Sequence, residues 1–268
     1  MRIAGILATG LLIAIGIVGP AQAQDLREFC ADRPGLGTPS CTVDAGHVVV
    51  EAGAADWTLE RDSETRTDTL QAGDLLVRAG LTETLEAQIG WTAFGHVRER
   101  DATGAVTRTS GVGDIRVALR RNLANPDGSR FSVAVMPFAT LPVGGAAIGA
   151  GDWGAGLIAP VHFDLTGKVG LSLTPQAEAA VDEDRHGRHL AYGAVVGLDR
   201  SLSDALSATL EFQLTRDDDP LESHSEALAS LSFALQPNDD LQFDAGAVAG
   251  LNAQSPDVEL YVGVARRF

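Results

Sequence analysis

A glycine-rich stretch has the spacing of a nucleotide-binding turn. Residues 149–154 read Gly-Ala-Gly-Asp-Trp-Gly, which satisfies G-x-G-x-x-G. A dinucleotide site needs a strand before this motif and a helix after it, and here the sequence predicts a following strand. We therefore interpret the glycines as part of a flexible loop and expect no cofactor.

Two acidic segments carry residue types that could bind a divalent cation. His186 and His189 lie beside the acidic residues 182–184, and three aspartates occupy 217–219. Neither segment has the ligand spacing of a regular element. We expect both to be solvated loops without a metal, although the second could instead bind divalent cations beside lipopolysaccharide.

The two cysteines lie close together near the N-terminus. Cys30 and Cys41 enclose a short segment that contains two prolines and two glycines. Because an exported chain enters an oxidising compartment, the spacing favours a disulfide. A metal site is the alternative, and it would need Asp32, Asp44 and His47 as further ligands.

The N-terminus and the charge balance limit the class of protein. Residues 1–23 contain one cation, an apolar run and a terminal Ala-Gln-Ala, which predicts a cleaved signal peptide rather than an anchor. The net charge of −16 argues against nucleic-acid binding. We expect a periplasmic segment at 24–46 and a second unit at 47–268.

The second unit repeats one pattern twelve times. Each repeat is about ten residues of alternating apolar and polar or small side chains followed by turn residues, which predicts an antiparallel strand. The expected strands are 47–58, 70–81, 84–97, 111–121, 130–141, 153–165, 168–181, 189–199, 205–216, 222–235, 241–251 and 257–268.

Loop lengths alternate along this unit. Connections after even-numbered strands are short, such as 82–83 and 166–167, whereas those after odd-numbered strands, such as 60–69, 98–110 and 182–188, are mostly longer and more charged. This alternation is typical of transmembrane barrels with short periplasmic turns and long outer loops. The fold class is therefore all-β, a transmembrane antiparallel barrel of about twelve strands. A soluble periplasmic β-protein is the alternative.

An apolar exterior and a polar lumen follow from that fold. The disulfide-tied segment 25–46 could close this lumen from the periplasmic side. Charged residues of the polar faces are the candidates for selecting solutes, or they pair and fill the interior. They are Glu86, Arg116, His162, Glu178, Glu211, Glu226, Asp244, Glu259 and Arg267.

An enzyme is disfavoured. Twelve-stranded outer-membrane phospholipases use a serine and a histidine on the lipid-facing side, whereas His162 and His224 lie on the lumen parity. The sequence has no G-x-S-x-G motif. We expect no catalytic residue.

Two short motifs resemble a known family. Gly111, Gly113 and Asp114 begin one strand as G-x-G-D, and Leu141, Pro142 and Gly144 end the next as L-P-x-G. This pattern resembles the outer-membrane transporter-like proteins grouped under the MetA pathway of phenol degradation. The resemblance implies a twelve-stranded barrel and uptake of aromatic or other hydrophobic compounds.

The last strand carries a second resemblance. Residues 257–268 alternate and end in Phe268, like the terminal strand that the barrel assembly machinery recognises. We expect a passive channel for small solutes in the bacterial outer membrane, in contact with lipids and lipopolysaccharide. A non-conducting barrel whose outer loops bind a partner remains the alternative.

Overall fold

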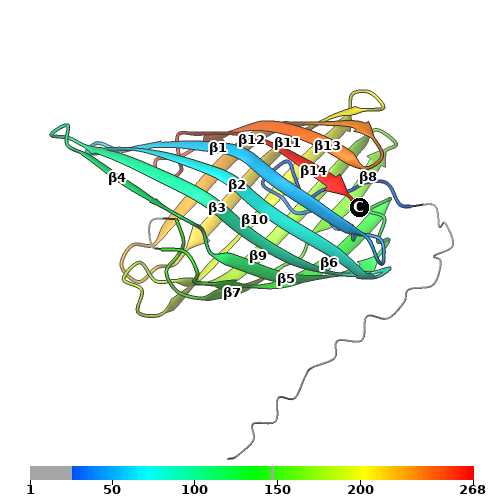
Figure 1. Cartoon of the computed structure of the whole chain (residues 1–268), viewed down its shortest axis with the longest axis horizontal. Coiled ribbons are helices and arrows are strands. Elements are labelled where there is room, and N and C mark those ends of the chain that lie inside the picture. The colour runs from blue at the N-terminus through cyan, green and yellow to red at the C-terminus, as the bar shows by residue number, and fades with distance from the viewer. Residues whose placement is uncertain (1–25, 146–147) are drawn as a thin grey trace, which may run out of the picture.

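The protein is a closed antiparallel barrel (Figure 1). The computed structural model describes residues 26–145 and 148–268, so the predicted signal peptide lies outside the described residues. No helix within these ranges is long and apolar enough to span a bilayer. The sheet closes because β10 pairs with both β9 and β11. The strands are β1 (Val48–Arg61), β2 (Thr65–Thr82), β3 (Leu85–Asp101), β4 (Val106–Gly111), β5 (Ile115–Ala124), β6 (Phe131–Leu141), β7 (Gly154–Ile158), β8 (Val161–Thr166), β9 (Val169–Val181), β10 (Arg188–Ser201), β11 (Leu206–Asp217), β12 (His224–Asn238), β13 (Leu241–Gly250) and β14 (Val258–Arg267).

These strands occupy twelve positions around the barrel. Strands β4 and β5 both pair with β3, and β7 and β8 both pair with β6 and β9. The first interruption contains Gly113, whose amide donates to the carbonyl of Thr92 at 2.8 Å. The second contains Pro160, which has no backbone N–H to continue the ladder. The prediction of a twelve-stranded barrel is confirmed.

The apolar side chains face outward. On β11, Leu210, Phe212 and Leu214 are 42%, 51% and 61% exposed, whereas Glu211 between them is 4% exposed. Burying such an apolar side chain away from water contributes about 1.5–3 kcal/mol, so a protein in water would turn this face inward. The alternative of a soluble β-protein is therefore wrong.

Two predicted outer loops are instead continuous β-structure. Residues 60–69 belong largely to β1 and β2, which pair out to Arg61 and Arg66, and β3 pairs with β4 between Arg98 and Arg108. These hairpins project beyond the rest of the barrel (Figure 1). Their sequence is rich in threonine and charged residues on both faces, so the hydrophobic alternation that predicts a strand is absent.

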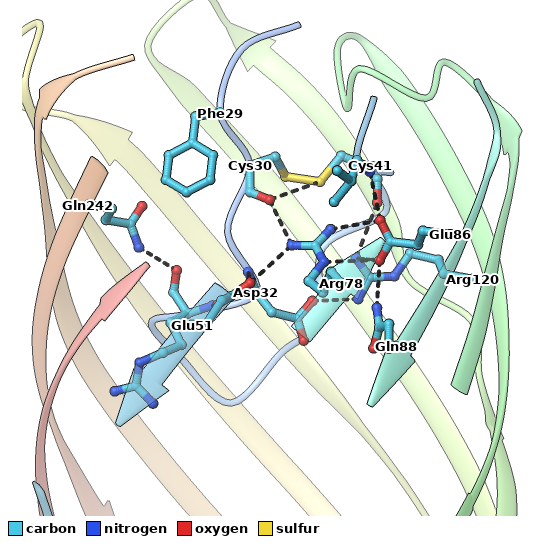
Figure 2. Close-up of polar contacts among 12 residues, drawn as sticks. Phe29, Cys30, Asp32, Cys41, Glu51, Arg78, Glu86, Gln88, Arg120 and Gln242 are labelled. Atoms are coloured by element: carbon cyan, nitrogen blue, oxygen red, sulfur yellow. Dashed lines mark hydrogen bonds and ion pairs between the residues drawn. A yellow bond between two sulfur atoms is a disulfide. The ribbon is translucent and has the colours of Figure 1, made fainter. Parts of the chain in front are cut away.

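The segment before β1 lies inside the barrel (Figures 1 and 2). We predicted a periplasmic segment at 24–46 that could close the lumen, and its described part, residues 26–46, folds into the lumen at the end that holds the C-terminus. This plug contains no strand or helix, so its backbone polar groups need partners elsewhere. The inner wall of the barrel supplies many of them.

Candidate functional site

A cluster of buried charges lies on the inner wall beneath the plug (Figure 2). The Arg78 guanidinium lies 3.2 Å from Glu51 and 3.0 Å from Glu86. Arg120 lies 3.3 Å from Glu86 and also pairs with Asp32 of the plug. The side chains of all four wall residues are completely buried. Buried charges are tolerated only when each is paired and hydrogen-bonded, as these are.

The same charges bind the backbone of the plug. Arg78 donates to the carbonyl of Cys30 at 2.8 Å, and Arg120 donates to that of Cys41 at 3.2 Å. Glu51 accepts the amides of residues 32–33 at 2.8 and 2.9 Å, and Glu86 accepts the amide of residue 43 at 2.7 Å. Because hydrogen bonds to ionised groups are the stronger ones, this cluster fixes the path of the plug.

Strands β11 and β13 hold the tip of the plug. Arg33 pairs with Asp244 at 2.9 Å, and its carbonyl accepts a hydrogen bond from Gln242 at 2.7 Å. Glu211 accepts the amides of residues 36–37 at 2.7 and 2.9 Å. Gly35 has a φ of 120°, and a Cβ there would lie 2.6 Å from a Glu211 carboxylate oxygen. The positive φ therefore favours glycine at this position.

The predicted disulfide is confirmed. Cys30 and Cys41 are bonded, and their Cα atoms lie 6.6 Å apart. The bond closes the part of the plug whose two cysteine carbonyls are held by Arg78 and Arg120. The crosslink and the charge cluster therefore restrain the same turn of chain.

A cavity of about 330 Å³ remains between the plug and the wall. Phe29 and Pro39 of the plug give it an apolar side, whereas His162, Ser172 and Thr209 of the wall give it hydrogen-bonding groups. Binding sites for small molecules commonly combine apolar surface with a few polar groups. This cavity can therefore accept a small solute that has both characters.

The predicted lumen residues divide into three groups by position. Glu86, Glu211, Asp244 and Arg267 contact the plug; the last donates to the carbonyl of Arg27 at 2.7 Å. His162 lines the cavity. The remaining four have no hydrogen bond or ion pair to the plug among the described residues. Arg116 stacks on the Phe138 ring at 3.8 Å. The other three are half-buried: Glu178, Glu226 and Glu259.

Sequence reasoning missed three members of the central cluster. Glu51, Arg78 and Arg120 were not among the candidates, although each lies on the polar parity of its strand. The available signal was that parity, combined with the fact that β1, β2, β3 and β5 are neighbours. Charges at one level of adjacent strands must meet inside the barrel.

The two family motifs contact each other at the end of the barrel opposite the plug. Asp114 accepts the amide of Gly144 at 2.9 Å and that of Ala150 at 2.8 Å. A Cβ at Gly144 would lie 2.5 Å from the carbonyl oxygen of Val112. Leu141 pairs with Ile115, so the motifs end one strand and begin its neighbour. In this chain Asp114 therefore attaches residues 144 and 150, on either side of the undescribed residues, to the wall. Gly154 begins β7, so the G-x-G-x-x-G stretch precedes a strand as predicted.

Comparison with known sequences identifies one family. Residues 31–268 match the family described as "Putative MetA-pathway of phenol degradation". No curated protein matches the sequence.

Solved structures share the fold at low sequence identity. The NanC porin aligns with a TM-score of 0.51 and 9% identity, over 82% of this chain and 98% of that chain. The transport unit of the autotransporter AIDA-I from Escherichia coli aligns with a TM-score of 0.52 and 7% identity, over 82% and 89%. The CymD monoaromatic hydrocarbon channel aligns at 8% identity over 84% and 88%, and its TM-score of 0.47 supports no conclusion about this chain. The first two similarities show the fold alone.

Proposed function

The chain belongs to the family of the MetA pathway of phenol degradation, and we propose that it is a passive channel for small solutes in the bacterial outer membrane. The observation that carries this proposal is the distribution of side chains in the barrel. Leucine and phenylalanine face outward, and charged residues such as Glu51 and Arg78 are buried inside. A barrel of this kind suits a lipid exterior and an aqueous interior. Lipids and lipopolysaccharide would contact the apolar exterior.

The cavity beside the plug supports a particular size and chemistry of solute. Its volume of about 330 Å³ lies at the lower end of the range of small-molecule sites, which is roughly 300–1,000 Å³. The ring of Phe29 suits an apolar or aromatic face, and His162 and Thr209 suit a hydroxyl group. We therefore propose small solutes, including hydroxylated aromatic ones, as the compounds that pass.

The plug favours a second candidate function. Its backbone is bound by Glu51 and Glu86 and also by Glu211. A plug held this firmly is also compatible with a barrel that conducts nothing and presents its outer loops to a partner. The two functions differ in whether solute crosses the intact protein.

Solute flux into liposomes separates these functions. The refolded protein is reconstituted, and swelling is recorded with a small sugar and with an ionised aromatic acid, because both cross lipid slowly. A channel increases entry of at least one solute over protein-free liposomes. A barrel whose folding is verified by heat-modifiable migration and that admits neither solute would contradict the channel and favour the closed barrel.

A further inference from the structure

Two acidic segments that lie far apart in the sequence converge at the end of the barrel opposite the plug. Asp182 follows β9, and His189 is the second residue of β10. Asp217 ends β11, and Asp219 lies in the connection to β12. Because β10 pairs with both β9 and β11, the two connections are neighbours. The His189 ring lies between them.

Both nitrogens of the His189 ring face carboxylates. Nδ1 lies 3.0 Å from Asp182 and 3.4 Å from Asp219, and Nε2 lies 2.7 Å from Asp217. The His189 side chain is only 5% exposed, and those of Asp182 and Asp219 are 13% and 7% exposed. Nε2 is buried and has no partner with hydrogen-bond geometry among the described residues.

This cluster is short of positive charge. Among the described residues, His189 is the sole ion-pair partner of Asp182, Asp217 and Asp219. The nearby arginines pair elsewhere, Arg188 with Asp152 and Arg216 with Asp218. A neutral imidazole has one N–H, so its other nitrogen has a lone pair and no proton. That nitrogen would face a carboxylate oxygen, which also has lone pairs, and the two would repel each other. Either a second ring proton or a bound cation removes this repulsion.

We propose that Asp182, His189 and Asp219 form a binding site for a divalent cation of the zinc type. A ligand atom from each of these residues lies within 4.8 Å of the other two. Bonds of about 2.0–2.1 Å to tetrahedral zinc place neighbouring ligand atoms about 3.3–3.4 Å apart, close to the 3.0 and 3.4 Å that separate Nδ1 from Asp182 and Asp219. Imidazole with two carboxylates suits zinc better than calcium, which takes six or more oxygen ligands.

Surrounding groups hold the ligands in place. Asp219 accepts the backbone amides of Glu183 and Leu221, each at 2.7 Å, so both of its oxygens are positioned. These hydrogen bonds also lower the pKa of Asp219 and favour the ionised form that binds a metal. A metal on Nδ1 confines the ring proton to Nε2, beside Asp217, and an outer carboxylate in this position is common around metal-bound histidines. The bound ion would join the β9–β10 and β11–β12 connections.

Zinc titration of the full refolded barrel tests this site. After treatment with a chelator, isothermal titration with Zn²⁺ should show one saturable site per chain. Loss of a ligand should weaken binding by at least about tenfold in His189→Gln and in Asp219→Asn. The matched control is His186→Gln, because this histidine lies in the same connection with its side chain 85% exposed. The control should bind within about twofold of the wild type. Heat-modifiable migration verifies folding of every variant.

Two results would overturn the proposal. Absence of saturable Zn²⁺ binding in the folded wild type would mean that a protonated His189 neutralises the cluster alone. Equal binding by the wild type and His189→Gln would mean that acidic loops attract the ion without this site. Co²⁺ provides a second readout, since its visible spectrum should change with wild type and His186→Gln but not with His189→Gln. None of these results depends on whether the barrel conducts solute.

Discussion

Arg78 and Glu86 form an ion pair at 3.0 Å inside the barrel, and both side chains are completely buried under the plug. They come from β2 and β3, which are adjacent strands. Each also binds the plug, Arg78 through the carbonyl of Cys30 and Glu86 through the amide of Val43. This pair of wall residues therefore contributes both to the stability of the barrel and to the position of the plug.

Replacing Glu86 with glutamine should destabilise the barrel. The substitution keeps the shape of the side chain but leaves Arg78 and Arg120 without the carboxylate that they share. Breaking one partner of a buried ion pair costs about 3–5 kcal/mol in the free energy of unfolding. Urea unfolding in detergent, followed by tryptophan fluorescence, measures this change.

The matched control for Glu86→Gln is an exposed ion pair. Arg66 lies 2.9 Å from Asp68 and is 47% exposed. Exposed pairs contribute about 0–1 kcal/mol, so Arg66→Gln should leave the unfolding midpoint almost unchanged. Equal effects of the two substitutions would show that the buried cluster is not a special source of stability.

Replacing both cysteines with serine should loosen the plug and leave the barrel folded. The disulfide closes a loop between residues 11 apart, and such crosslinks typically contribute about 2–4 kcal/mol. Hydrogen exchange should accelerate at the amides of Asp32 and Val43, which donate to Glu51 and Glu86. Exchange within β6 serves as the internal reference, because no described hydrogen bond joins β6 to the plug. Unchanged exchange in the plug would show that the wall contacts position it without the disulfide.

Replacing Asp114 with alanine should free the β6–β7 connection. Its carboxylate accepts the amides of Gly144 and Ala150, and each hydrogen bond to a charged group contributes about 1.5–3 kcal/mol. We expect exchange at these two amides to accelerate by about tenfold or more, because 1.4 kcal/mol corresponds to a factor of ten. Asp127→Ala in the β5–β6 turn is the control, since among the described residues the Asp127 carboxylate accepts hydrogen bonds only from Ser129 of its own turn. Slow exchange in Asp114→Ala would mean that packing holds the connection.

Removing Phe268 should impair assembly in the outer membrane more than it alters solute preference. Phe268 closes the seam of the barrel, because its amide donates to Val48 at 2.8 Å and its carbonyl accepts the Val48 amide at 3.1 Å. We propose that its exposed ring is also what the barrel assembly machinery recognises. Membrane fractionation with and without Phe268, and with Phe268→Tyr as the conservative control, measures assembly. Normal assembly without Phe268 would contradict this role.

Strand positions could be predicted because the apolar face must meet lipid. The predicted strand 205–216 is β11 (Leu206–Asp217), where leucine and phenylalanine alternate with polar residues. A loop was predicted where the strands extend beyond the apolar exterior, and the structure has a strand there, as at β4 (Val106–Gly111). A strand in water on both faces needs no hydrophobic alternation, and only pairing reveals it.

The contacts of the plug could not be predicted because they carry no local pattern. Arg33 and Asp244 pair across 211 positions of sequence. Asp244 and Glu211 were expected to face the lumen. A charged residue on the lumen face has the same sequence pattern whether its side chain contacts water or the plug, so the pattern does not reveal the plug contacts. The disulfide indicated a compact segment between Cys30 and Cys41 that could close the lumen, and it gave no information about which wall residues the segment contacts.

Conductance in a planar bilayer tests most directly whether the plug limits passage through the barrel. The informative variant lacks residues 26–43 and keeps the turn in which Gly46 donates to the carbonyl of Gly80 at 2.9 Å. Folding of both proteins is established by heat-modifiable migration. The structure predicts a larger single-channel conductance for this variant than for the intact chain. Equal conductance of the two folded proteins would contradict the account, because the plug would then not obstruct the path of the solute.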